Sequence, residues 1–173
     1  AGAVFFWVSP LFSAIIRVGR LFARPRFPVE IAQDYAAAIR LGQLGKKPIL
    51  IEKDTIGGVC LNIGCIPSKA LIRVARLKKQ IDAGKQIGVE VSDVKVDFGK
   101  VQAWKKTVVD RHVSGVEFLC KENHATIIKG EGRFRGPREL EVRTESGIES
   151  VQAENVIIAT GSRPVEIPGF KFD

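Results

Sequence analysis

Apolar residues recur at helical spacing in three stretches of this chain, and these stretches predict three helices. They cover residues 31–45, 66–84 and 97–116. Gly45 suits the C-terminal cap of the first helix, and Asp97 suits the N-cap of the third. We expect the apolar stripe of the third helix to lie in the core, and this stripe consists of Phe98, Val101, Trp104, Val108, Val113 and Val116.

Short apolar runs between and after these stretches predict strands. The run from Pro48 to Lys53 has the length of a buried strand and contains an acid, Glu52, near its end. Further strands are predicted at 125–129, 139–143, 147–151 and 155–159, the middle two as a hairpin. The last strand leads into Thr160 and Gly161, a small-residue turn that lets backbone approach a ligand at the edge of a sheet.

Residues 1–28 do not follow this alternation of helices and strands. Their apolar run from Ala3 to Ile16 has about 14 residues, fewer than the roughly 20 that span a bilayer, and Pro10 interrupts it. Arginines follow the apolar run instead of preceding it, which is the wrong order for a secretory signal. The segment fits a mitochondrial presequence and a misread start equally well.

The formal net charge of +8 is concentrated near the N-terminus. Residues 1–28 contain four arginines and no acid, whereas the remaining 145 residues contain 23 Lys and Arg against 19 Asp and Glu. This remaining balance is ordinary for a protein surface, and aromatic residues do not alternate with basic ones as they do on a nucleic-acid platform. We therefore expect no nucleic-acid partner. Three cysteines without a disulfide framework fit a reducing compartment.

The most informative stretch runs from Gly57 to Lys69 and contains two cysteines, Cys60 and Cys65, with four residues between them. A glycine pair precedes the cysteines and an apolar run of helical period follows them, so we expect both thiols at the start of a helix. The positive end of a helix and a nearby lysine favour thiolate over thiol. At least one of the two sulfurs should therefore be a good nucleophile.

Two other interpretations of this cysteine pair stay open: buried apolar side chains, or half of a zinc site. Glycines before the pair and Pro-Ser-Lys after it are unfavourable choices for packing alone. The further candidate zinc ligands are Cys120, His112 and His124, and none stands at ligand spacing from another. We expect both histidines at the surface, because neither has a nucleophile or an ordering carboxylate beside it in the sequence.

The residues Cys-Leu-Asn-Ile-Gly-Cys-Ile-Pro-Ser-Lys at 60–69, with Gly-Gly-Val before them, resemble the active-site segment of the flavin disulfide reductases, the class I pyridine nucleotide-disulfide oxidoreductases. The stretch 156–164 is similar to the second flavin-contacting motif of that family. Within the family, Leu61, Ile66 and Ser68 favour the enzymes that oxidise dihydrolipoamide over the glutathione and mercuric reductases. The resemblance covers about four-fifths of the chain.

This resemblance implies an α/β fold: the N-terminal lobe of a Rossmann-like FAD-binding domain, with a parallel sheet, helices and an antiparallel hairpin layer. It implies that residues 29–173 are part of this domain, and that residues 1–28 are an ill-defined leader or a misread start. The NAD domain and the dimerisation domain are expected to be absent. The chain would then be an N-terminal fragment of a longer protein.

The first strand and the glycine-rich phosphate turn of the family are missing or altered in this sequence. Aligning Tyr35 with the matching aromatic residue of the family puts Val29, Ile31 and Asp34 where three glycines should be. A side chain at each position fills space that the backbone needs in order to approach a diphosphate, and Asp34 adds a negative charge there. The prolines just before these positions also make a poor central strand.

The resemblance implies a redox-active disulfide, in which Cys60 exchanges with the dithiol substrate and Cys65 lies against the flavin. Glu52, 18 positions after Asp34, would bind the adenosine ribose, although alone it would be a solvated carboxylate at a strand end. No metal site is expected. The other implied FAD contacts are Lys53, Gly57, Gly58, Val59, Cys60, Lys69, Gly132, Ala159, Thr160 and Gly161.

The implied activity is FAD-dependent oxidation of protein-bound dihydrolipoamide, with NAD as the electron acceptor, in a homodimer. The implied partners are lipoyl domains of 2-oxo acid dehydrogenase complexes or of the glycine cleavage system, and no membrane. The acid–base His of the family belongs to the C-terminal domain, which we expect to be absent from this chain. We expect a cytoplasmic protein, or alternatively one of the mitochondrial matrix. The alternatives are a glutathione or mercuric reductase-like flavoenzyme and a non-enzymatic remnant that binds no flavin.

Overall fold

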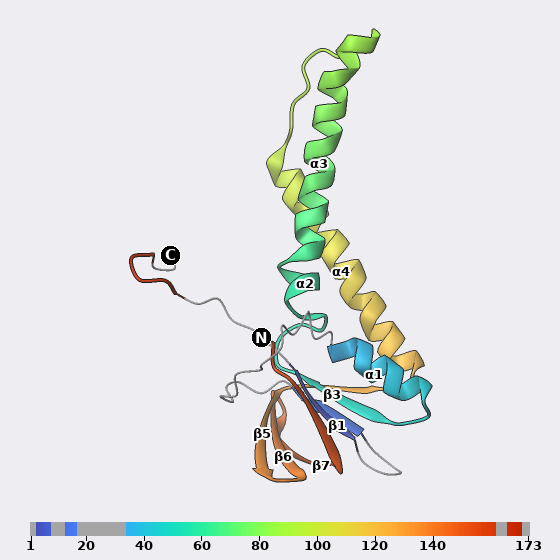
Figure 1. Cartoon of the computed structure of the whole chain (residues 1–173), viewed down its shortest axis with the longest axis vertical. Coiled ribbons are helices and arrows are strands. Elements are labelled where there is room, and N and C mark those ends of the chain that lie inside the picture. Colours follow the sequence, from blue (N-terminus) through green and yellow to red (C-terminus); the bar gives the residue numbers. More distant parts are fainter. Residues whose placement is uncertain (1–2, 8–12, 17–33, 162–165, 171–173) are drawn as a thin grey trace.

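The computed structural model describes residues 3–7, 13–16, 34–161 and 166–170, whose elements form three layers (Figure 1). Helices cover one face of a five-stranded sheet, and a three-stranded sheet packs on the other face. The helices are α1 (Asp34–Gln43), α2 (Gly58–Asn62), α3 (Cys65–Gly84), the 3-10 turn η1 (Lys85–Ile87) and α4 (Phe98–Glu122). The strands are β1 (Ala3–Trp7), β2 (Ser13–Ile16), β3 (Pro48–Glu52), β4 (Thr126–Lys129), β5 (Glu131–Gly136), β6 (Glu139–Thr144), β7 (Gly147–Gln152) and β8 (Asn155–Ala159).

The five-stranded sheet has the order β1-β8-β2-β3-β4 and is mostly parallel. Strands β2, β3, β4 and β8 run in one direction, whereas β1 pairs antiparallel with β8 and β2. The carboxyl ends of the four parallel strands therefore meet at one edge, where open α/β sheets bind ligands. The second sheet, β5-β6-β7, is antiparallel throughout. This architecture confirms the predicted α/β lobe.

The apolar run within residues 1–28 forms two strands that the sequence pattern did not predict. β2 lies between β3 and β8 and is parallel to both, with Ile16 opposite Ile51 and Ile15 opposite Ile157. The implied fold has its first strand at this central place in the sheet. The first strand of the family is therefore present in altered form, and it is not missing. Pro10 concealed it, because it divides the run into pieces too short to be distinguished from a leader.

The described part of helix α1 begins at Asp34, and the predicted start at Ile31 lies outside the described residues. Residues 17–33 lie outside the described residues, and so do Val29 and Ile31 of the altered phosphate turn. The helix ends before Gly45, whose φ of +73° is the left-handed conformation of a helix C-terminal glycine. The predicted cap is therefore confirmed.

Strand β3 is buried on both faces and joins the two hydrophobic clusters of the molecule. Leu50 is fully buried on the helix side, where it packs in a cluster with Ala38 of α1 and Cys120 of α4. Ile51, the next residue, is fully buried on the other side, against Leu140 of the three-stranded sheet. Successive strand residues point to opposite faces. One short strand therefore holds all three layers together.

Helices α3 and α4 form a long hairpin that projects away from the sheets (Figure 1). Only the end of α4 near the sheet lies in the core, where Val116 is 7% exposed. Phe98 and Trp104, at the far end, are 61% and 43% exposed, so the expectation that the whole apolar stripe lies in the core is wrong. The far half of each helix extends beyond the sheet, and a helix buries an apolar face only where another element covers it.

The remaining elements agree well with the sequence pattern, with one omission. The Asp97 carboxylate accepts a hydrogen bond from the Lys100 N–H at 3.1 Å and so caps α4 as predicted. Strands β4, β6, β7 and β8 lie where they were expected. Strand β5 was not predicted, because its alternating Arg and Gly residues carry little apolar signal. It completes the hairpin to a three-stranded sheet.

Among the described residues, one segment, Gly58–Ile87, has the length and apolar composition of a membrane-spanning helix. The segment is not a continuous helix, since α2 ends at Asn62 and α3 begins at Cys65. Helices of folded domains pass the same test, so this is weak support for a membrane location.

We predict that Gly42→Ala lowers the free energy of unfolding by about 2 kcal/mol or more. A Cβ at Gly42 would lie 1.8 Å from the backbone O of Asn123, so α1 and the end of α4 would have to separate. Urea unfolding measures the change. Gly115→Ala is the matched control, because nothing lies within 4 Å of a Cβ there and Ala should gain about 0.5–1 kcal/mol in a helix. Equal stability of the two variants would contradict the packing described.

Candidate redox site

Cys60 and Cys65 form a disulfide, with their Cα atoms 4.7 Å apart. Cys60 lies within α2, and Cys65 is the first residue of α3, so the bond joins two consecutive helices. The predicted pairing is confirmed. Cysteines that are bonded to each other cannot be zinc ligands, and they are not two separate apolar side chains. The disulfide therefore excludes, for this oxidised state, both the zinc site and the simple packing role considered from the sequence.

Two glycines create the turn that leads from β3 into α2. Gly57 and Gly58 have φ values of +105° and +62°, which residues with a Cβ rarely adopt. A Cβ on Gly57 would also lie 2.6 Å from Cδ1 of Leu61, a buried residue of α2. The backbone conformation of this turn therefore requires the glycine pair, independently of any contact with a ligand.

Two residues that sequence reasoning did not single out hold the disulfide in place. A Cβ on Gly64 would lie 3.0 Å from the Val59 O and 3.2 Å from the Cα of Cys60, so a glycine there lets the chain pass close beside α2. The Asn62 amide donates to the backbone O atoms of Thr55, Ile56 and Gly58 at 3.2, 3.1 and 2.9 Å. Both residues lie between the two cysteines in the sequence, and this position was the only sign that could have pointed to them.

Cys65 occupies a position that favours a thiolate once the disulfide is reduced. It is the first residue of the 20-residue α3, and Gly64 at the N-cap offers no side chain to the helix N–H groups. The first turn of α3 carries no acid. Lys69, one turn into the helix, is exposed. The helix end therefore stabilises negative charge on this sulfur.

The disulfide is accessible from solvent through an apolar rim. Both cysteines are half-buried, and their neighbours Val59 and Ile63 are 40% and 76% exposed. Thiol–disulfide exchange needs an attacking thiolate to approach a sulfur along the S–S axis, so partial exposure is a condition of that chemistry. The pair meets this condition.

The predicted cofactor residues lie at the carboxyl edge of the sheet. Glu52 is the last residue of β3 and Lys53 follows it. Ala159 is the last residue of β8, which runs in the same direction, and Thr160 and Gly161 follow it. The loop after β3 leads directly into Gly57 and the cysteine pair. One edge therefore collects these groups, as expected for a ligand site of an open α/β sheet. Their individual roles stay predictions.

Glu52 differs from the solvated strand-end carboxylate that its position alone suggested. It is 3% exposed, and its Oε1 accepts a hydrogen bond from the Asp54 N–H at 2.8 Å. Its backbone O accepts from the Gly130 N–H at 2.9 Å, which fastens β3 to the start of β5. Lys53 forms an ion pair of 3.6 Å with Glu131 of β5. Gly132, buried in β5, is thereby brought near this edge.

A Rossmann fold holds a diphosphate at the start of its first helix, and the described part of α1 begins at Asp34. Asp34 is 4% exposed and accepts a hydrogen bond at Oδ1 from the Tyr35 N–H at 2.8 Å. Helix N-termini bind anions through their N–H groups and dipole. A buried carboxylate at Asp34 would repel a diphosphate placed beside it, whereas the disulfide fits a redox partner.

The third cysteine is excluded from this chemistry. Cys120 of α4 is fully buried and unpaired with another cysteine. Burial raises the pKa of its thiol to about 12, and the nearby carboxylates of Asp34 and Glu117 act in the same direction. Burial also raises the pKa of Tyr35, with further contributions from Asp34 and Cys120. Cys120 is therefore a core thiol, inert beside the pair.

Both histidines lie at the surface, as predicted. His112 is exposed on α4, where its Nδ1 lies 2.7 Å from the backbone O of Val108. His124 is exposed just after α4 and has a φ of +57°.

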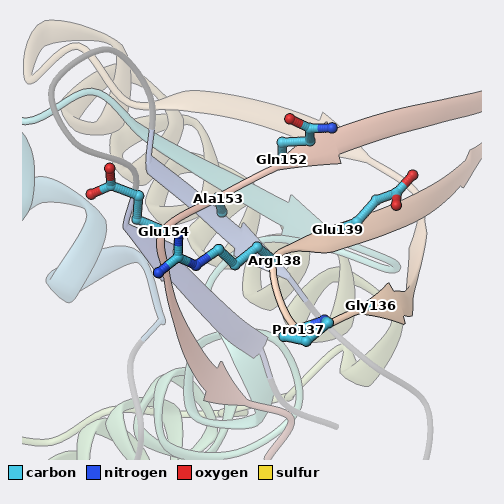
Figure 2. A pocket seen from close by; sticks show the side chains of 7 residues that line it. All are labelled: Gly136, Pro137, Arg138, Glu139, Gln152, Ala153 and Glu154. Carbon is cyan, nitrogen blue, oxygen red and sulfur yellow. The ribbon is translucent and has the colours of Figure 1, made fainter.

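A shallow cavity of about 430 Å³ lies away from the predicted site residues (Figure 2). It is formed by the turn between β5 and β6 and by the segment between β7 and β8. The cavity therefore lies near the amino end of β8, whereas the predicted site residues lie at its carboxyl end. Figure 2 shows the Arg138 side chain extending toward Glu154, whose carboxylate points away from it. None of the predicted site residues lines it. The lining residues are Gly136, Pro137, Arg138, Glu139, Gln152, Ala153 and Glu154.

Comparison with known proteins agrees with this geometry. A sequence model of the family described as pyridine nucleotide-disulphide oxidoreductase matches residues 35–173. The dihydrolipoyl dehydrogenases of Geobacillus stearothermophilus and Bacillus subtilis are each 46% identical over 138 residues, 80% of this chain and 29% of the relative. The dihydrolipoyl dehydrogenase of Halobacterium salinarum is 45% identical over 141 residues, 80% of this chain and 30% of the relative. The chain thus spans about three-tenths of the length of these curated relatives.

We predict that the free energy of unfolding falls as the pH rises above about 9. The folded thiol of Cys120 keeps its proton up to a pKa of about 12, whereas an ordinary thiol of pKa 9.0 loses it earlier, so alkali favours the unfolded state. Urea unfolding at several pH values between about 8 and 10.5 measures the slope. Cys120→Ala should make the slope shallower, and an unchanged slope would contradict the burial of this thiol.

Proposed function

We propose that this chain, which belongs to the pyridine nucleotide-disulphide oxidoreductase family, carries the redox-active disulfide of a dihydrolipoyl dehydrogenase. One observation carries the proposal: an accessible disulfide joins Cys60 in α2 to Cys65 at the first residue of α3. The family and the names of the relatives support an oxidoreductase that uses a disulfide. The substrate, the acceptor and the partners of the whole protein are proposals.

The chemistry assigned to the pair is exchange with a dithiol. A thiolate of dihydrolipoamide attacks the Cys60 sulfur, the Cys60–Cys65 bond breaks, and Cys65 leaves as a thiolate that the end of α3 stabilises. The second thiolate of the substrate then displaces Cys60, which closes the lipoamide disulfide. The substrate loses two electrons and two protons, and the cysteine pair gains two electrons. One proton remains on Cys60, and the other is left to solvent or to a base.

Cys60 is the better candidate for the attacked sulfur, because the other sulfur is the better leaving group. A thiol of lower pKa leaves faster, and Cys65 lies at a helix N-terminus whereas Cys60 lies inside the short α2. The exposed Val59 and Ile63 beside the pair suit the hydrocarbon chain of a lipoyl group better than the charged ends of glutathione. This contrast supports the lipoamide branch over glutathione reductase.

FAD and NAD are the cofactors of this family in general, and we propose them for the whole protein. Lipoyl domains of 2-oxo acid dehydrogenase complexes or of the glycine cleavage system would be its partners, and a homodimer its assembly. We assign to the described residues only the thiol–disulfide exchange, since residues 17–33, which include the positions of the family's phosphate turn, lie outside them. A cytoplasmic or mitochondrial-matrix location is consistent with the reduced thiol Cys120.

The buried carboxylate of Asp34, which stands where the family has a glycine, favours a second candidate, a thiol–disulfide exchange protein that works without flavin. Refolding the chain with excess FAD, removing unbound FAD and recording the visible absorbance separates the two. A flavin band at one equivalent supports the flavoenzyme. A colourless protein whose disulfide still exchanges with dithiols supports the second candidate.

We predict that dihydrolipoamide reduces the disulfide of the oxidised chain. Acid quenching, denaturation and alkylation with N-ethylmaleimide should then give three labels by mass spectrometry, against one label, on Cys120, before reduction. An equal concentration of reduced glutathione should act at least about tenfold more slowly, because the second thiol of a dithiol closes its ring within one molecule. Cys120→Ala, the control, should exchange normally and carry one label fewer.

We also predict that Cys60→Ser and Cys65→Ser each abolish dihydrolipoamide oxidation when this segment is part of a chain as long as its relatives. Each change removes one of the two sulfurs that the exchange requires. The turnover of dihydrolipoamide with NAD measures the effect. Turnover retained in either variant would contradict the assigned roles, whereas failure of the unmodified chain to react with dihydrolipoamide would refute the substrate.

A further inference from the structure

We infer that the exposed basic side of α3 is a docking surface for an acidic protein, which presents its dithiol to the Cys60–Cys65 disulfide. The inference rests on the proposed function and deepens it, because it names the surface that binds the partner and the charge that the partner carries. We call this surface the cationic stripe, and it consists of Lys69, Arg73, Arg76 and Lys79.

The basic excess of residues 29–173 is concentrated in α3. This helix carries five Lys and Arg against one acid, Asp82, whereas residues 29–173 as a whole carry 23 Lys and Arg against 19 Asp and Glu. The rest of that segment is therefore balanced in charge. One helix with the whole excess creates a local positive potential, which attracts an acidic surface and speeds its association.

The cationic stripe follows one side of α3 and begins beside the disulfide. Residues that are three or four positions apart lie on the same face of a helix. From Cys65 onward, the stripe advances by four, four and three positions as far as Arg76. With a rise of 1.5 Å per residue, Arg76 lies about 16 Å along the helix axis from Cys65. A partner bound along the stripe therefore lies next to the disulfide.

The stripe lies on the side of α3 that α4 does not cover. On the opposite side, where α3 packs against α4, Ala70 is buried and Val74 is half-buried. All four residues of the stripe are exposed, and none of them forms an ion pair within the part of the chain that the structure describes. Lys78 differs, since it pairs with Asp82 at 2.8 Å. The charges of the stripe are therefore available to carboxylates of a partner.

An acidic protein fits this surface better than a lipid bilayer or a second copy of the chain does. Helices that lie on a membrane combine basic residues with a broad apolar face that contains Trp, Phe or Leu. Helix α3 has no aromatic residue, and the large apolar side chains that it exposes are Ile72 and Leu77, at 47% and 48%. A second copy would bring the same positive charge, and like charges oppose association.

The test uses two synthetic peptides that carry a lipoyl-lysine and a fluorescent label, one flanked by glutamates and the other by glutamines. Fluorescence anisotropy with the oxidised peptides measures their binding to the full 173-residue chain. We expect the glutamate peptide to bind at least about tenfold tighter at about 20 mM salt and to lose this advantage at about 500 mM. After reduction, it should also open the disulfide at least about tenfold faster than the glutamine peptide at low salt, because binding raises its local concentration.

Replacement of Arg73, Arg76 and Lys79 by Gln in one variant should abolish the preference for the glutamate peptide. Gln is a good helix former, so the variant should fold and should react with neutral dihydrolipoamide at the rate of the unmodified chain. Lys69 is left unchanged, because it is one of the predicted FAD contacts. The matched control should keep the preference, and it replaces three exposed cations of α4 by Gln: Lys100, Lys106 and Arg111.

Equal binding of the two peptides to the unmodified chain overturns the inference, and so does a preference that the α3 variant retains or that the α4 variant also loses. Binding to phosphatidylglycerol vesicles that only the α3 variant loses, without binding of the glutamate peptide, would assign the stripe to a membrane and overturn the inference as well. The oxidised peptides need no exchange chemistry to bind. Failure of the proposed function would appear separately, as a lack of reaction with neutral dihydrolipoamide.

Discussion

The fold of this chain depends on the burial of β3 on both of its faces. Leu50 faces the helices and Ile51 faces the three-stranded sheet, and both side chains are fully buried. The strand therefore fixes where its own carboxyl end lies, and with it the loop that leads into the cysteine pair. A two-sided strand of five residues is enough to place the chemistry because the loop after it is short.

The local geometry of the cysteine pair comes from its own segment more than from the rest of the fold. Gly57 and Gly58 permit the turn, Gly64 permits close approach, and Asn62 ties the turn to α2 with three hydrogen bonds. Each of these features involves residues within one stretch of sequence. The stretch that carries the sequence motif is therefore the same stretch that fixes the geometry of the disulfide. This explains why the Cys60–Cys65 pairing could be predicted from the sequence.

Elements whose signal is local were predictable from the sequence, and elements that depend on distant partners were not. The disulfide segment, the Asp97 cap and the strand at 155–159 fall in the first class. The strand at Ser13–Ile16 falls in the second, since only pairing with β3 and β8 shows that a short apolar run is a central strand. The burial of Glu52 and the exposure of Phe98 also depend on packing that periodicity does not report.

The disulfide spans only five positions of sequence, and this has a consequence for the working cycle. A cross-link that encloses so small a ring restricts the unfolded chain little, by about 2 kcal/mol in the chain-entropy account. Neither cysteine belongs to a hydrophobic cluster or to a paired strand, so opening the bond removes no contact of the core. The molecule can thus alternate between oxidised and reduced forms many times with its architecture intact, as a reusable carrier of reducing equivalents must.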